Sequence, residues 1–178
     1  MPLPDFSGNV DFLSHYKELM MLYENAVDFI TMRLGIIQSE CAAKDFHIPI
    51  RSYTSRIKEY SSLVMKLRKQ GYPLTFRSIL ENMHDVGGVR ALCEYIPDIY
   101  AVRDTLFEHD RIQLVEEKDY IKHPKSNGYR SLHLVVCVPV PLFSVSRWCS
   151  ARFSSAPQQW IPEPDWNTIP ATSRAESR

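Results

Sequence analysis

Large apolar residues recur at steps of three and four near the start of the chain, which is the spacing of one face of an α-helix. The stripe comprises Phe12, Tyr16, Leu19, Tyr23, Val27, Ile30, Leu34 and Ile37. Because an apolar stripe needs a surface to cover it, we expect a long N-terminal helix that packs on the core or on another subunit.

A second helical pattern follows Pro49 and is stopped by Gly71 and Pro73. Its apolar positions are Tyr53, Ile57, Tyr60, Val64 and Leu67. Basic residues gather elsewhere on the same segment: Arg56, Lys58, Lys66, Arg68 and Lys69. The sequence therefore predicts a basic helix.

The pattern then alternates between helices and strands. Thr75 is a candidate N-cap for a short helix that runs to Met83, residues 89–96 read as a strand, and residues 98–109 as a helix. Two more strands are expected at about 111–116 and 132–140, joined by a polar loop over 118–130. Helices interleaved with β-branched strands predict a sheet with helices packed on it, of α/β or α+β class.

Composition narrows the class of protein. A chain of 178 residues with 44% hydrophobic residues can bury one core. Its 21 basic and 21 acidic residues give no net charge to attract nucleic acid or membrane, and no apolar run is long enough to span a bilayer. The four cysteines lie far apart, which argues against a zinc ribbon or a disulfide scaffold. We expect a soluble, cytoplasmic protein with no membrane partner.

Residues 85–90 form the first chemically informative cluster. Asp85 could hold Mg²⁺, Gly87 and Gly88 could let the backbone approach a phosphate, and Arg90 could grip a phosphate or stack on a base. An ordinary tight turn accounts for the same residues.

Residues 118–133 form a denser cluster around the turn Asn127-Gly128. Four basic residues, two histidines and two tyrosines fall within this segment, which suits recognition of a polyphosphate and a base. A solvated hairpin loop is the alternative, although it does not explain why tyrosines alternate with the charges.

With these clusters in place, the chain resembles the synthetase domain of RelA/SpoT proteins over residues 56–140, and its small size resembles the small alarmone synthetases. The matching signatures are Arg56-x-Lys58, the run from Asp85 to Cys93, Lys118-Asp119-Tyr120-Ile121, and Asn127-Gly128-Tyr129-Arg130-Ser131-Leu132-His133. The resemblance implies an α+β fold: a nucleotidyltransferase-like mixed sheet flanked by helices, behind a long N-terminal helix.

The same resemblance implies transfer of pyrophosphate from ATP to the 3′-hydroxyl of GTP or GDP, with Mg²⁺. It assigns ATP binding to Arg56, Lys58, Lys66, Arg68, Lys69 and Arg90, and metal ligation to Asp85. It assigns GTP or GDP binding to Lys125, Asn127, Tyr129 and His133. Asp85, Arg90, Arg130 and His133 are its expected catalytic residues, and a homo-oligomer, a tetramer in the family, is the expected assembly.

The resemblance breaks down after Val140. The family continues with a strand carrying Glu-x-Gln-x-Arg-Thr, whose glutamate serves the metal or the acceptor hydroxyl, and then with a helix ending near Leu-Glu-His. Neither motif is present, and from Ser144 the composition turns to tryptophan, proline and serine. Apolar periodicity is lost as well, so we expect this strand to be missing and the sheet edge after Val140 to be uncovered.

The genetic code offers a cause for this change. Read from the third base of each codon, Trp160-Ile161 must give Asp, Asp165-Trp166 must give Leu, and Trp166-Asn167 must give Glu, which is the family spacing. Codons permitted over 151–157 can spell Glu-Val-Gln-x-Arg-Thr in the same frame. We therefore hypothesise a frame shift between about Phe143 and Ala151, and expect this exact polypeptide to be inactive or nearly so.

Three segments follow from this division: a helical segment over 1–48, an incomplete synthetase domain over 49–143, and an aberrant, disordered tail over 144–178. The alternative function is a binding module without catalysis, for guanine nucleotides or for RNA. Neutral overall charge counts against RNA.

Overall fold

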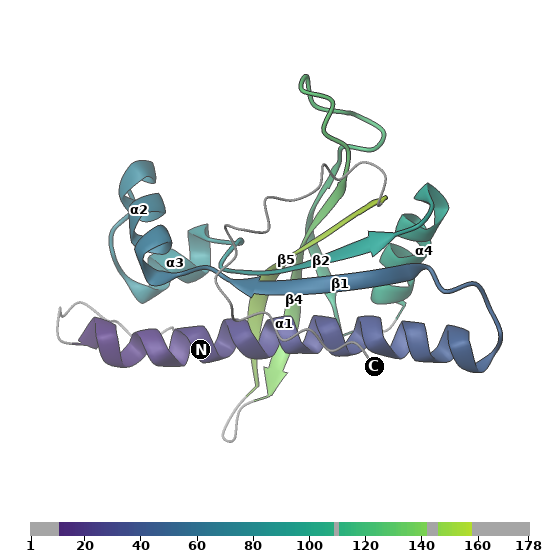
Figure 1. Ribbon diagram of the computed structural model, residues 1–178. Coiled ribbons are helices and arrows are strands. Elements are labelled where there is room, and N and C mark those ends of the chain that lie inside the picture. The colour runs from purple at the N-terminus through teal and green to yellow at the C-terminus, as the bar shows by residue number, and fades with distance from the viewer. Residues whose placement is uncertain (1–10, 109–110, 142–145, 158–178) are drawn as a thin grey trace.

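The computed structural model describes residues 11–108, 111–141 and 146–157. In these residues the elements follow one another as α1 (Asp11–Ala43), β1 (Ile50–Ile57), α2 (Tyr60–Gln70), α3 (Phe76–Asn82), β2 (Gly87–Cys93), α4 (Ile96–Phe107), β3 (Gln113–Asp119), β4 (Leu132–Pro141) and β5 (Ser146–Pro157). The expected α+β architecture with a long N-terminal helix is confirmed (Figure 1).

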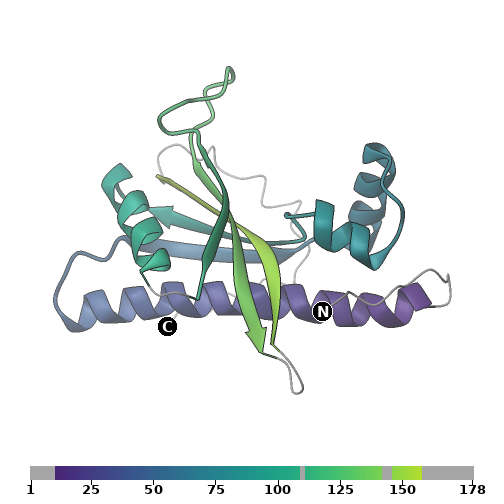
Figure 2. The same ribbon diagram turned by 180° about the vertical axis from the view of Figure 1, so that it is seen from behind.

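The five strands form one mixed sheet in the order β1-β2-β5-β4-β3. β2 and β5 run parallel, and the other neighbours run antiparallel. The helices α1 and α4 lie on one face of this sheet, and α1 crosses beneath the strands (Figures 1 and 2).

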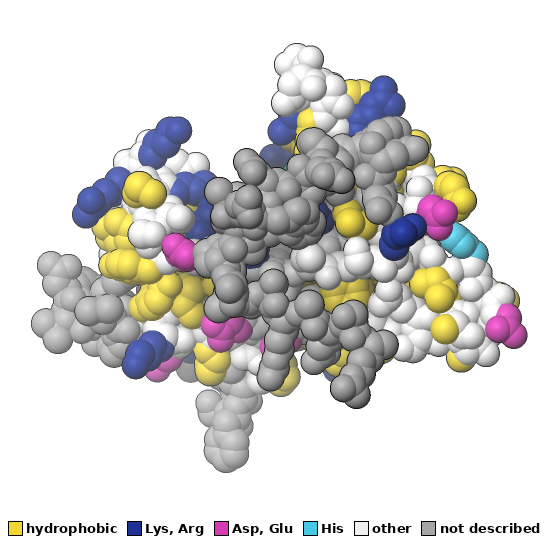
Figure 3. All heavy atoms as spheres, viewed as in Figure 1, with side chains coloured by type: hydrophobic (Ala, Val, Ile, Leu, Met, Phe, Trp, Pro, Cys, Tyr) yellow, Lys and Arg dark blue, Asp and Glu magenta, His cyan; other side chains and the backbone are white. Residues whose placement is uncertain are grey.

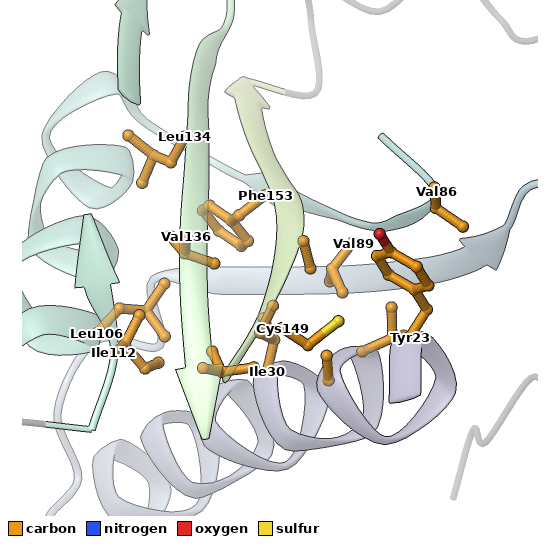
Figure 4. Close-up of a cluster of buried hydrophobic side chains, with 14 of the residues drawn as sticks. Tyr23, Ile30, Val86, Val89, Leu106, Ile112, Leu134, Val136, Cys149 and Phe153 are labelled. Carbon is orange, nitrogen blue, oxygen red and sulfur yellow. The ribbon is translucent and has the colours of Figure 1, made fainter. Parts of the chain in front are cut away.

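The apolar stripe of α1 forms the floor of the core. Tyr23 and Ile30 are almost completely buried and point toward β2 and β5, as Figure 4 shows. The Tyr23 hydroxyl also donates to the Met83 carbonyl at 3.5 Å. At Gly87 an added Cβ would lie 2.9 Å from a Val27 methyl carbon, so only glycine lets α1 approach β2 this closely.

The prediction of a basic helix after Pro49 is wrong for the first half of that segment. Residues Ile50–Ile57 form β1, which pairs antiparallel with β2, and the helix begins only at Tyr60. The pairing with β2 decides this, because sheet pairing overrides a weak helical pattern. Arg56 therefore lies on a strand and Lys58 in a connection. The predicted stop is confirmed, since Gly71 has the left-handed φ of 73° and caps α2.

The remaining boundaries differ by a few residues. Thr75 caps α3 as expected, its side-chain oxygen accepting from the Ser78 backbone N–H at 3.1 Å. β2 ends at Cys93 and α4 begins at Ile96, earlier than predicted, because Asp98 folds back to accept from the Tyr95 backbone N–H in a capping box.

The expectation of a missing strand after Val140 is wrong. β5 lies between β2 and β4, so it fills the centre of the sheet and leaves no uncovered edge at β4. Its buried residues Cys149, Ala151 and Phe153 alternate with Ser150 and Arg152, which is the period of a strand. Residues 158–178 of the predicted tail lie outside the described residues.

Within the described segments, none of the helices combines the length and the apolar composition that crossing a bilayer requires.

Candidate functional site

Two rows of side chains cross the sheet on the face opposite α1 and α4, which we call the polar face. Residues paired across neighbouring strands share a face, and Phe153 and Leu134, between the rows, belong to the buried cluster on the helix side (Figure 4). The strand register gives the first row as Arg56, Gly88, Arg152, Val135 and Glu116. It gives the second row as Thr54, Arg90, Ser154, His133 and Lys118.

Three arginines belong to these rows, and one of them, Arg152, is close enough to Glu116 to help Lys118 lower the pKa of that carboxyl. Glu116 pairs with Lys118 at 2.9 Å, but in the described part of the chain no ion pair forms at Arg56, Arg90 or Arg152. Arg90 and Arg56 are exposed, while Arg152 is half-buried. Unpaired guanidinium groups on one face suit an anionic ligand.

Asp85 lies at one end of the polar face, just before β2, and two lysines hold it. Lys58 and Lys66 each donate to one of its carboxylate oxygens at 2.7 Å. Burial by itself would raise the pKa of Asp85, but the hydrogen bonds from the two lysines outweigh it and lower the pKa to about 2. The structure thus brings together three of the predicted site residues.

The other two basic residues predicted to bind ATP, Arg68 and Lys69, lie exposed in the last turn of α2. In Figure 3, basic side chains gather over α2 and again beside the loop between β3 and β4. Basic side chains are thus visible at two separate places in this view.

An aromatic cluster lies at the opposite end of the polar face. The rings of Tyr129 and Tyr120 meet that of His133 edge to face, with centroids 5.7 and 5.3 Å away. Lys125 places its ammonium 4.5 Å from the centre of the Tyr120 ring and 5.3 Å from that of Tyr129. Lys125, Tyr129 and His133, all predicted to bind the guanine nucleotide, are brought together.

Asn127, also predicted to bind the guanine nucleotide, hydrogen-bonds to the backbone of the loop. Its side-chain oxygen accepts from the Tyr129 backbone N–H at 3.2 Å, and Gly128, with φ of 80°, donates to the Lys125 carbonyl at 2.8 Å. These bonds close the turn that carries Tyr129. Asn127 therefore shapes the loop, and Arg130 follows it, exposed, next to β4.

The loop over residues 120–131 is tied to α4 at its base. Asp119 accepts from the backbone N–H groups of Ile121 and Lys122 at 2.9 and 3.0 Å, and from the Tyr100 hydroxyl at 2.9 Å. Sequence reasoning missed Tyr100, because a contact across 19 residues leaves no local pattern.

His133 is held in its neutral form. Burial lowers its pKa most, Arg152, Lys125 and Arg90 add to the effect, and the pKa falls to about 4. The neutral ring can accept the Tyr129 hydroxyl proton at Nε2, 2.8 Å away. A base this weak, already engaged by a tyrosine, is a poor acceptor for a substrate proton at neutral pH.

Sequence reasoning also missed Arg152 and Ser154, the residues that β5 contributes to the polar face. A signal was present, since polar and apolar residues alternate from Ser150 to Ser154. The abrupt change in composition obscured it.

A metal site can be tested against these side chains. Among the residues that the structure describes, no group of three metal-ligating side chains converges. Asp85 offers a single carboxylate, which fits a Mg²⁺ ion that brings its remaining oxygen ligands from substrate phosphates and water. It does not fit an ion held by the protein alone.

Comparison with known proteins shows the family to which the chain belongs. Residues 55–150 match the family model described as the region found in RelA/SpoT proteins. The match ends within β5, before Arg152. The chain is 39% identical over 130 residues to the GTP pyrophosphokinase YwaC of Bacillus subtilis, covering 73% of this chain and 62% of YwaC. It is 33% identical over 129 residues to the GTP pyrophosphokinase YjbM of the same organism, covering 72% and 60%.

A similar architecture is found among solved structures. The small alarmone synthetase 1 of Bacillus subtilis, bound to its product pppGpp, superposes with a TM-score of 0.73 at 30% identity, over 81% of this chain and 73% of that one. The chain spans about three fifths of the length of the two curated relatives above, 62% and 60%.

Proposed function

This chain belongs to the RelA/SpoT family, and we propose that it carries the nucleotide site of a GTP pyrophosphokinase. In that reaction the ribose 3′-oxygen of GTP or GDP forms a bond to the β-phosphorus of ATP. The bond from that phosphorus to the α,β-bridging oxygen breaks, AMP leaves, and the proton of the 3′-hydroxyl passes to a base. The observation that carries the proposal is the polar face, whose rows connect the lysine pair at Asp85 with the aromatic cluster at Tyr129.

ATP is assigned to the end of the face near α2. Arg56, Lys58 and Lys66 supply positive charge where the triphosphate would lie, and Arg90 stands next to them on β2. Arg68 and Lys69 extend that charge along α2. Their role is to neutralise and align the phosphates. Catalysis of phosphoryl-type transfer consists mainly of such positioning and neutralisation of charge.

The guanine nucleotide is assigned to the aromatic end. Tyr129 offers a ring for stacking on guanine, and Lys125 and Arg130 bring charge for phosphates. His133, on β4, meets the Tyr129 ring edge to face. When bound, Mg²⁺ would neutralise phosphate charge beside Asp85, its one carboxylate ligand from the described residues.

We further propose that the chain as written binds nucleotides without turning them over. Accepting the 3′-hydroxyl proton needs a base on the polar face, and β5 offers only Arg152 and Ser154 in its two rows. Glu116, the carboxylate of the first row, is paired with Lys118 at 2.9 Å. The pKa of about 4 makes His133 a weak substitute.

Calorimetric titration with GDP tests this proposal. We expect the wild-type chain to bind GDP and Tyr129→Ala to bind it about tenfold more weakly or worse, because stacking on one aromatic ring contributes about 1–3 kcal/mol. Tyr72→Ala, which removes an exposed tyrosine after α2, is the matched control and should bind like the wild type.

Two results would overturn this assignment. Absence of GDP binding, together with a steeply salt-dependent affinity for single-stranded RNA, would identify an RNA-binding module instead. Release of AMP from ATP in the presence of GDP, by sequence-verified protein, would overturn the absence of turnover.

Self-association and a cytoplasmic location are part of the same proposal. The outer side of α1 exposes Met21, Met32 and Ile36, a row of apolar side chains that a second copy could cover. Light scattering that gives the mass of a monomer at micromolar concentration would contradict the oligomer.

A further inference from the structure

The loop over residues 120–131 carries Tyr129, yet little of the loop packs on the rest of the molecule. Figures 1 and 2 show the segment between β3 and β4 projecting beyond the ends of the strands. Every residue over 122–128 is exposed. The position of the Tyr129 ring therefore depends on the bonds at the base of the loop, where the chain leaves β3 and enters β4.

Asp119, the last residue of β3, holds the first end of the loop. Its Oδ1 accepts from the backbone N–H groups of Ile121 and Lys122 at 2.9 and 3.0 Å. Its Oδ2 accepts from the Tyr100 hydroxyl at 2.9 Å. A carboxylate that is held at one oxygen presents the other in a fixed direction, so the Tyr100 hydroxyl sets how Oδ1 meets the backbone of the loop.

Tyr100 is the firmer of the two side-chain donors at this carboxylate. The Lys122 ammonium lies 3.5 Å from Oδ2, but the Lys122 side chain is 66% exposed, and such ion pairs contribute little. Burial and the hydrogen bond to Asp119 raise the pKa of Tyr100 to about 12. The hydroxyl therefore keeps its proton and remains a donor at neutral pH.

Tyr100 acts from the side of the sheet opposite the proposed nucleotide site. Asp119 pairs with the buried Leu132, so its side chain lies on the face that α4 covers. His133 is the next residue of β4 and lies on the polar face, where its Nε2 is 2.8 Å from the Tyr129 hydroxyl. A nucleotide on the polar face lies out of reach of Tyr100, which can affect its binding only through the loop.

We propose that Tyr100 is a positioning residue for guanine-nucleotide binding: through Asp119 it holds the loop in the arrangement that presents Tyr129. This inference rests on the proposed function, since it takes Tyr129 as the guanine-binding residue. Without the hydroxyl, the loop occupies this arrangement for a smaller fraction of the time, and the apparent affinity falls with that fraction. It gives α4, which carries none of the predicted site residues, a part in binding.

Calorimetry with GDP on a double-mutant cycle tests the proposal. We expect Tyr100→Phe to weaken GDP binding about fivefold in the wild-type background. In the Tyr129→Ala background the same substitution should weaken it by less than about twofold, because the ring that Tyr100 positions is gone. Asp119→Asn, which weakens the same contact from its other side, should behave like Tyr100→Phe in both backgrounds.

Tyr95→Phe is the matched control, because it removes a hydroxyl that also donates to a carboxylate, that of Glu94 at 3.2 Å, outside the loop. It should bind GDP like the wild type. Hydrogen exchange at the backbone N–H groups of Ile121 and Lys122 provides a readout that needs no ligand. Exchange there should be faster in Tyr100→Phe and unchanged in Tyr95→Phe.

The possible results separate the two proposals. GDP binding by the wild type with no loss in Tyr100→Phe overturns this inference and leaves the proposed function standing. An equal loss in both backgrounds overturns it as well, since Tyr100 would then act on stability or on another part of the site. Absence of GDP binding by the wild type overturns the proposed function, and this inference with it.

Discussion

At the scale of single residues, Asp85 forms ion pairs in this structure and is also the proposed metal ligand. Both of its carboxylate oxygens are engaged by lysines, each 2.7 Å away. Phosphates that attract Lys58 and Lys66 would free the carboxylate for a metal ion carried by the same nucleotide. The ion pairs therefore keep three predicted site residues together before a substrate arrives.

The pKa of about 2 at Asp85 makes its contribution to stability depend on pH. A lowered carboxyl pKa stabilises the folded chain above the unfolded value of 3.8, and this stability is lost as pH falls from there toward 2. We expect Asp85→Asn to lower the free energy of unfolding by about 1–2 kcal/mol at pH 6, and by clearly less at pH 3.

Urea unfolding of both proteins at the two pH values measures this difference. Asp104→Asn, at an exposed carboxylate on α4 paired only with its neighbour Arg103, should change stability little at either pH. A difference at Asp85 that does not shrink in acid would show that its ion pairs do not stabilise the fold.

At the scale of elements, β5 decides the structure of the sheet. It is parallel to β2 and antiparallel to β4, so without it the strands β1 and β2 would have no sheet contact with β4 and β3. It also places Phe153 in the core and Arg152 on the polar face, one residue apart. One element thus joins the two ends of the site.

Phe153→Ala tests the central position of β5. The side chain is completely buried, so we expect the free energy of unfolding to fall by about 3–5 kcal/mol. Trp148→Ala removes a larger ring from the same strand, but Trp148 is 50% exposed, and its loss should have a much smaller effect. Equal, small losses in both variants, measured by urea unfolding, would mean that residues 146–157 do not form a core strand.

At the scale of the whole molecule, the mixed sheet forms although β5 lacks the motif that the resemblance leads us to expect. The sheet, α1 and the two clusters of site residues are all present, while β5 carries Arg152 and Ser154 on the polar face instead of the Glu-x-Gln-x-Arg-Thr that the resemblance implies. The frame-shift hypothesis accounts for this combination. A β5 translated in the other frame would bring a carboxylate to the part of the polar face that Arg152 now occupies.

Sequencing the DNA across the codons for Val140 to Arg178 tests that hypothesis directly. We expect a single-base insertion or deletion between about Phe143 and Ala151 that restores Glu-x-Gln-x-Arg-Thr. A chain made from the corrected frame should release AMP from ATP and GDP, whereas the chain as written should show no turnover above background. An intact frame, with no such motif in any reading, would make β5 and Arg152 native features of this protein.

The sequence by itself determined the elements whose signals are local. Steps of three and four fixed α1, Thr75 and Gly71 fixed helix ends, and the motif from Asn127 to His133 identified the family. The sequence did not predict contacts between residues that are distant along the chain. The segment of β1 has a helical pattern but forms a strand because it pairs with β2. The segment of β5 has an unusual composition but forms a strand between β2 and β4. The anchoring of Asp119 by Tyr100 and the place of Arg152 beside Gly88 depend on strand register and tertiary packing. Only the tertiary structure sets these, because side chains far apart in the chain become neighbours only when the sheet forms.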